Sequence, residues 1–232
     1  MKPTQAPLRL GLNTVKIHMT ESDDKRYHHG DLRRALIDAS LAILQEQGIE
    51  RFTLRAAARR AGVSAGAPAH HFGNIVGLLT AVAVEAYDAL GASLDAIRID
   101  GAHAATLRGM GRAYVQFAIT RPAEFRLMFR KDLVAHDSPE FVRAARDALS
   151  GLGSAAGRAA GYAEKSSNGG AEAAYAAWSL IHGLAHLAVE DKLSPIWPDL
   201  TPDRLLDGPI AAILQQQWPD GAGQRGSREV LL

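Results

Sequence analysis

Histidine pairs are the side chains in this sequence with the most evident capacity for chemistry. His182 and His186 are four residues apart, so on a helix they share one face and could hold a metal ion. Zinc hydrolases with this spacing carry HExxH, in which a glutamate follows the first histidine as general base. Here Gly183 follows His182, and no third ligand has an evident place. We therefore interpret His182 as a polar group in an apolar helix; an enzyme or metal protein that uses both histidines is the alternative.

Two adjacent pairs, His28-His29 and His70-His71, invite a similar metal hypothesis. Both lie in a basic region, where adjacent histidines are more typical of solvated or DNA-facing side chains. The chain has no cysteine, which excludes disulfides and thiolate metal sites. It also lacks a P-loop, a G-x-S-x-G nucleophile motif and a dinucleotide-binding fingerprint. We predict no metal, no cofactor and no catalytic residues.

The stretch TLRAAARRAGVSAGAPAHHF, residues 53–72, has the capping residues and the glycine stop signal of two short helices. Thr53 can cap the first, because its hydroxyl oxygen can accept a free amide of the first turn. Gly62 can adopt the left-handed conformation that ends a helix, and Ser64 is a second possible cap. The second helix is expected over residues 65–71. This pattern predicts a helix-turn-helix, whose second helix is sized to enter the DNA major groove.

The flanks sharpen this prediction. From Tyr27 to Tyr87 the sequence resembles the DNA-binding region of the TetR family of one-component transcription regulators, with HHGDLR before the first helix and HF closing the motif. A later W-x3-HG, formed by Trp178, His182 and Gly183, resembles the subgroup named for its WHG ligand-binding domain. The resemblance implies a ligand-responsive DNA-binding regulator without enzymatic activity. It would be a homodimer, most often a repressor that a small-molecule effector releases from a double-stranded operator.

The family's DNA contacts can be carried over by position. Its recognition helix faces base edges, and phosphates are contacted by the end of that helix and by the first residues of helices 1, 2 and 4. The positions implied here are Tyr27, His29, Thr53, Arg55, Ser64, Ala65, Gly66, Ala67, Ala69, His70 and His71. Ala65 and Ala67 are small enough for close approach and for contact with a thymine methyl. Thr53 and Ser64 can donate hydrogen bonds to phosphate.

Some positions depart from the family pattern. The family usually has an aromatic residue where Ala69 stands and a lysine near Ile75, and both commonly contact phosphate. Their loss predicts a weaker salt dependence of DNA binding, or compensation by Arg55, Arg59 or the leading arm. Pro68 falls at the fourth position of the expected second helix, so it removes at most one backbone hydrogen bond.

The rest of the chain reads as helical, because no stretch alternates with period two. Helices are expected over residues 31–47, 75–98, 104–120, 123–131, 140–163, 172–191 and 203–218. The fold class is therefore all-α: a three-helix head with the helix-turn-helix, joined by a long fourth helix to a helical body. The expected divisions are a disordered leader (1–26), a DNA-binding domain (27–90), a ligand-binding and dimerisation domain (91–218) and a tail (219–232).

Charge is uneven along the chain. Residues 1–75 hold eleven Lys and Arg against seven Asp and Glu, whereas residues 76–232 hold fifteen against eighteen. A basic head and a mildly acidic body suit a protein that meets DNA at one end. No apolar run of the roughly 20 residues needed to cross a bilayer is apparent, and no convincing signal peptide. We expect a cytoplasmic protein that does not contact a membrane.

A sensor pocket is expected between the helices at 104–120, 123–131 and 172–191. Its predicted lining is Tyr114, Phe117, Phe125, Met128, Trp178 and His182. Aromatic and methionine walls with one or two polar groups are typical of small-molecule sites; the alternative is that these side chains fill the core. The helix at 172–191 is apolar almost all round, which favours burial, and with the helix at 203–218 it is expected to form a two-fold dimer interface.

Overall fold

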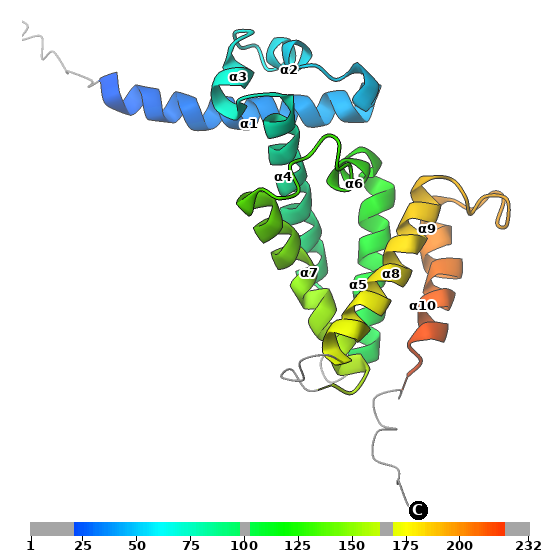
Figure 1. Cartoon of the computed structure of the whole chain (residues 1–232). Coiled ribbons are helices and arrows are strands. Elements are labelled where there is room, and N and C mark those ends of the chain that lie inside the picture. The colour runs from blue at the N-terminus through cyan, green and yellow to red at the C-terminus, as the bar shows by residue number, and fades with distance from the viewer. Residues whose placement is uncertain (1–20, 98–102, 163–168, 221–232) are drawn as a thin grey trace, which may run out of the picture.

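The computed structural model describes residues 21–97, 103–162 and 169–220, with side chains from residue 32 onward. Over these ranges the chain is helical and contains no strand, so the all-α prediction is confirmed. Figure 1 shows a small head of α1, α2 and α3 across one end of α4, with the remaining helices below α1. The predicted leader up to residue 20 and the tail from residue 221 lie outside the described residues.

The head begins with one long helix, α1 (Glu21–Gln47). The other elements of the head are the 3-10 turn η1 (Ile49–Arg51), α2 (Leu54–Arg60) and α3 (Ala67–Phe72). The prediction that α1 starts at residue 31 was wrong, and residues 21–26, expected in the disordered leader, are helical. Acidic residues at 21, 23 and 24 favour a helix N-terminus at this place. Gly30 costs a helix interior only ~1 kcal/mol relative to alanine, so it does not break α1.

The helix α4 (Ile75–Asp95) connects the head to the body. The Asn74 side chain caps it by accepting from the Gly77 amide at 3.0 Å. By length and composition alone α4 could cross a membrane, which the sequence reading overlooked, but 56% of its most apolar window is buried inside the protein. It packs most extensively against α7 and is a core helix. Its last residue is Asp95, short of the expected end near residue 98.

The body consists of α5 (His103–Thr120), α6 (Pro122–Met128), α7 (Pro139–Ala159), α8 (Gly169–Val189), α9 (Pro202–Leu205), η2 (Leu206–Ile210) and α10 (Ala211–Gln217). Three of these helices start at a proline, where the missing amide costs no intrahelical bond. Ser138 caps α7 and Thr201 caps α9 through their hydroxyl oxygens. The single helix expected at 203–218 is interrupted by the π-helical turn η2, which contains Pro209.

The burial expected for α8 is incomplete in the single chain. Its buried residues are Ala177, Ile181, Leu184 and Ala185. Elsewhere on the helix Tyr175 is 68% exposed and Leu187 is 43% exposed. The sequence pattern indicated the correct helix, with ends displaced by a few residues, but these two apolar side chains have no cover within the described chain.

Candidate functional site

The turn between α2 and α3 has the geometry expected of a helix-turn-helix. The Thr53 hydroxyl oxygen accepts from the Ala56 amide at 3.0 Å and caps α2. At the other end Gly62 has φ 69°, a left-handed conformation suited to glycine. The Val63 amide then donates to the Ala58 carbonyl at 3.0 Å, which closes the helix end. The chain thus turns sharply from one helix toward the next.

The start of α3 differs from the prediction. Ser64 is not its cap: Gly66 occupies that position without a side-chain hydrogen bond, and α3 begins at Ala67. The Ala67 amide instead donates to the Ser64 carbonyl at 3.0 Å, so residues 64–67 form a turn. Pro68 is therefore the second helical residue rather than the fourth. An amide at that position has no intrahelical partner, so the proline costs no helical hydrogen bond.

One side of the helix-turn-helix faces solvent. The predicted DNA-facing residues that are exposed are Thr53, Arg55, Ser64, Ala65, Gly66, Ala69 and His70. Ala67 and His71 are half-buried, whereas Ala57, Ala58 and Pro68 are buried against the head's core. Tyr27 and His29 lie on α1, but their side chains are outside the described residues. The predicted contact residues that can be described thus lie largely on an accessible surface.

The arginines of α2 differ in their partners. Arg60 forms two hydrogen bonds of 2.6 Å to the Glu46 carboxylate and joins α2 to α1. Arg55 and Arg59 are exposed and have no ion-pair partner among the described residues. Positive charge on the head is therefore available to a polyanion at Arg55 and Arg59, the residues expected to compensate for the missing family lysine.

In the body, the buried Tyr114 and the half-buried His182 form a polar pair. The Tyr114 hydroxyl lies 3.0 Å from Nδ1 of His182. Burial lowers the pKa of His182 to about 4, and the neighbouring His186 contributes to this lowering. Burial also raises the pKa of Tyr114, a rise that the adjacent Trp178 opposes. The hydroxyl therefore stays protonated and donates to an unprotonated Nδ1, which leaves the histidine proton on Nε2.

Aromatic rings surround this pair. The His182 ring lies 5.2 Å from Trp178, 5.6 Å from Phe125 and 4.4 Å from Phe129, measured between centroids. His186 adds a fourth ring at 4.6 Å. The sequence reading placed neither Phe129 nor His186 in the pocket. Helical spacing could have found both, because each follows a predicted pocket residue by four positions.

Two of the predicted pocket residues have other surroundings. The Phe117 ring lies beneath the Arg121 guanidinium, 5.6 Å from ring centroid to Cζ. Met128 is fully buried. Their role in binding a small molecule stays a prediction. The term aromatic cluster is used below for Tyr114, Phe125, Phe129, Trp178, His182 and His186.

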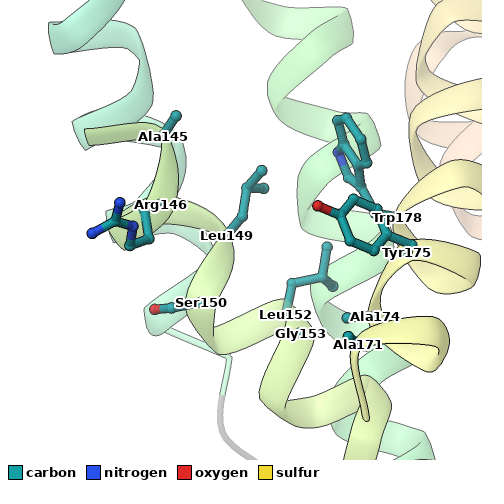
Figure 2. Close-up of a pocket in the computed structure, with 10 residues that line it drawn as sticks. All are labelled: Ala145, Arg146, Leu149, Ser150, Leu152, Gly153, Ala171, Ala174, Tyr175 and Trp178. Carbon is teal, nitrogen blue, oxygen red and sulfur yellow. The ribbon is translucent and has the colours of Figure 1, made fainter. Parts of the chain in front are cut away.

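A groove adjoins the aromatic cluster. It lies between α7 and α8 and has a volume of about 510 Å³. Its lining is Ala145, Arg146, Leu149, Ser150, Leu152, Gly153, Ala171, Ala174, Tyr175 and Trp178. Figure 2 shows leucines of α7 facing the two aromatic residues of α8 across this space. Trp178 alone belongs to both the groove and the predicted pocket, so it stands between the open groove and the buried rings.

A buried carboxylate joins the head to the body. Glu124 on α6 is 3% exposed. It accepts from Gln45 of α1 at 3.2 Å and from Arg121 at 3.1 Å. Burial raises the pKa of Glu124, and Arg121 opposes this rise. Nothing in the sequence pattern distinguished this residue, because its partner Gln45 is distant in the chain.

The histidine pair has few of the features of a metal site. In the part of the chain that the structure describes, no group of three His, Cys, Asp or Glu side chains could hold a metal ion. Nδ1 of the half-buried His182 already forms a hydrogen bond with Tyr114. The arrangement thus suits hydrogen bonding inside an apolar cluster.

An exposed helix-turn-helix on a separate helical body defines a helix-turn-helix DNA-binding regulator. Comparison with known families agrees. The family described as "Bacterial regulatory proteins, tetR family" matches residues 36–82, and "Tetracyclin repressor-like, C-terminal domain" matches residues 107–213. The chain belongs to the TetR family, as its sequence predicted. Membership of the WHG subgroup stays a prediction.

Individual proteins resemble this chain in part of its sequence or in fold. The HTH-type transcriptional regulator BetI of Cronobacter sakazakii is 51% identical over 49 residues, which are 21% of this chain and 24% of that protein. A protein of unknown function from Rhodococcus sp. RHA1 is 26% identical with a TM-score of 0.64, over 82% of this chain and 97% of that one. A TetR family transcription regulator from Marinobacter aquaeolei VT8 shares the fold at 18% identity and a TM-score of 0.59, over 83% and 96%.

Proposed function

We propose that this protein is a cytoplasmic transcriptional repressor that binds an operator as a homodimer and leaves it when a small molecule binds the body. The observation that carries this proposal is the surface of the helix-turn-helix. Most of the small and polar side chains from Ser64 to His70 face solvent, beside the exposed Arg55 and Arg59. Small residues permit close approach to base edges, and the arginines supply phosphate contacts.

The exposed apolar side chains of α8 support dimerisation. Tyr175 and Leu187 are large apolar side chains on one helix that the rest of the described chain leaves exposed. Such a surface is stable in water when a partner covers it, and a second copy of the chain related by a two-fold axis is the simplest partner. A symmetric dimer would present two α3 helices to DNA, so the operator should be nearly palindromic.

The aromatic cluster is the proposed sensor. Its rings form a series from Trp178 through His182 to Phe129. The Phe129 ring packs edge-on against Tyr87 of α4, with 6.4 Å between the ring centroids. The helix α4 continues into the head. Displacement of these rings therefore changes the packing against α4 and, through α4, the position of the head. Glu124 forms a second connection, from α6 to α1.

The regulatory step follows from linkage. An effector that prefers the body shape incompatible with DNA weakens DNA binding by its differential affinity for the two shapes. DNA must weaken effector binding by the same factor. Tenfold release of DNA therefore requires a tenfold difference in effector affinity between the two shapes.

Selection of genomic fragments bound by the purified full chain tests the proposal. We expect enrichment of one or a few near-palindromic sites, each bound by two chains, as measured by sedimentation of the complex. A chain that sediments as a monomer at micromolar concentration contradicts the dimer. Failure to enrich any fragment contradicts operator binding.

The rival hypothesis is a helical enzyme that uses His182 and His186. Under the regulator proposal, substitution of both histidines leaves operator binding measurable, because the head is intact. Under the rival hypothesis the substitution abolishes a turnover that the unaltered chain performs. Family membership favours the first reading, since TetR proteins are generally not enzymes.

A further inference from the structure

The helix α3 carries no lysine or arginine of its own, since its sequence is APAHHF. The exposed residues that follow it, Gly73 and Asn74, are uncharged, and Ile75 is 38% exposed at the start of α4. The exposed arginines described above, Arg55 and Arg59, belong to α2, which precedes α3. A cation at the C-terminal end of α3 must therefore come from another element.

Arg33 of α1 supplies a cation at this place. Its Cζ atom lies 5.4 Å from the centroid of the Phe72 ring, and Phe72 is the last residue of α3. At this distance the ring face attracts the guanidinium by a cation–π interaction. The Asn74 amide donates to the Phe72 carbonyl at 2.9 Å, so the backbone that carries the ring is fixed beside the start of α4. Arg33 thus lies at the junction of α3 and α4.

The charge of Arg33 is not neutralised by any side chain that the structure describes. Arg33 is exposed, and no ion pair or hydrogen bond of its side chain occurs within those residues. The adjacent Arg34, by contrast, pairs with Asp38 at 2.9 Å and with Glu85 at 3.1 Å. Neighbouring arginines of one helix therefore differ: Arg34 joins α1 to α4, whereas Arg33 has N–H donors available for an anion.

The Phe72 ring makes Arg33 better suited to bind a phosphate. An arginine side chain loses rotamer freedom on binding, and the contact with the ring already restricts part of this freedom. The ring has no oxygen that would occupy the N–H donors, so the planar guanidinium can donate to two oxygens of one phosphate. A helix in the major groove has a phosphate backbone on each side. Cations both before α3 and at its end would hold it in register.

We propose that Arg33, held over Phe72, binds a DNA phosphate at the C-terminal end of α3. Arg33 makes the contact, and Phe72 is a positioning residue. The contact rests on the proposed function for its place on an operator, although binding of a phosphate concerns any duplex DNA. Because a phosphate carries no sequence information, the contact adds affinity for all sequences alike.

Salt titrations of DNA binding test the contact. The full chain is titrated with poly(dA-dT) duplex and with the selected genomic fragment, followed by fluorescence anisotropy. Arg33→Gln should weaken binding of both by about 3- to 10-fold and flatten the slope of log affinity against log salt by about 0.9. Arg34→Gln is the matched control, because it removes the same charge from the next residue, where the guanidinium is already paired. Its slope should stay unchanged.

Three results would overturn the phosphate contact, provided that circular dichroism shows folded variants. They are an unchanged slope in Arg33→Gln, equal flattening by Arg33→Gln and Arg34→Gln, and a loss confined to the genomic fragment. Arg33→Lys keeps the charge without the planar fork, so it should keep the slope and lose less affinity than Arg33→Gln. A flattened slope in a folded Arg33→Lys protein likewise contradicts the contact.

A double-mutant cycle tests the positioning role of Phe72. Phe72→Leu keeps the cation and an apolar side chain, so affinity should fall by about two- to fivefold while the salt slope stays unchanged. In an Arg33→Gln background the same substitution should have little further effect, because the side chain that the ring holds is absent. A full effect of Phe72→Leu in that background would show a purely structural role and overturn the positioning.

Failure of this contact and failure of the proposed function are distinguishable. If a genomic fragment is enriched and Arg33→Gln binds it with an unchanged salt slope, the regulator stands and the contact is wrong. If Arg33→Gln flattens the slope on poly(dA-dT) but no genomic fragment is enriched, the phosphate contact stands and operator binding is wrong.

Discussion

The Tyr114 hydroxyl lies 3.0 Å from Nδ1 of His182 and joins α5 to α8 inside the aromatic cluster. Tyr114→Phe removes the donor and leaves Nδ1 of the half-buried His182 ring without a partner. We expect the free energy of unfolding to fall by about 1–2 kcal/mol, measured by urea denaturation. Tyr162→Phe, at a tyrosine that is 41% exposed, is the control and should change stability by less than about 0.5 kcal/mol. Equal effects of the two variants would show that the Tyr114–His182 bond contributes nothing.

Stability should fall with acid in a window set by His182. Its pKa is about 4 in the folded protein, below the ordinary value of 6.5. The unfolded chain therefore binds a proton at higher pH than the folded one. The stabilising contribution of His182 is complete above pH 6.5 and is lost as the pH falls toward 4, by at most about 3 kcal/mol. In His182→Gln, denaturation curves should show a shallower loss between pH 6.5 and 4. Parallel curves for the two proteins would contradict the assignment.

Arg55 should contribute equally to the binding affinity for all DNA sequences. Arg55→Ala removes an exposed cation of the helix-turn-helix, so it should weaken operator and non-specific DNA binding to the same degree. The slope of log affinity against log salt should flatten by about 0.9 for each phosphate that the variant no longer neutralises. Arg143→Ala, in a body arginine paired with Asp147, is the control and should leave the slope unchanged. Weakened binding of the operator alone would assign Arg55 to base recognition instead.

Glu124 should couple the stability of the head and the body. Glu124→Ala leaves Gln45 and Arg121 without their common acceptor, and we expect the free energy of unfolding to fall by about 1–3 kcal/mol. Glu124→Gln retains an acceptor and should be less destabilising. A double-mutant cycle with Gln45→Ala measures the contact itself and should give an interaction energy of at least about 0.5 kcal/mol. Strict additivity would mean that this contact does not join α1 to α6.

The sequence predicted the elements better than it predicted their ends. Cap and turn residues such as Thr53 and Gly62 act locally, so they indicated the helix-turn-helix correctly. The start of α3 was misplaced because Ser64 has the right chemistry for a cap, whereas the chain forms a turn first. The start of α1 was placed ten residues too late, at 31 instead of 21, because the acidic residues at 21, 23 and 24 were not used as a helix start signal.

Contacts between distant segments were harder to predict. Tyr114 and His182 were placed in one pocket because helical faces converge, and the structure brings them together. Glu124 with Gln45 and the groove beside Trp178 depend on how helices cross, which no local pattern encodes. The apolar character of α8 was expected to place it in a dimer interface, which stays a prediction; its exposed Tyr175 and Leu187 suit a partner.

The measurement that tests the central claim most directly is operator binding by Ala67→Asp, followed by fluorescence anisotropy with the selected fragment. Ala67 is a half-buried residue that begins α3; under the proposed function α3 enters the major groove, so a carboxylate there would lie close to the DNA phosphates and bases. We predict that this variant loses operator binding while circular dichroism shows an intact fold, and that Ala92→Asp, at an exposed position of α4, binds normally. Unchanged operator affinity in a folded Ala67→Asp protein would contradict the assignment of α3 as the recognition helix.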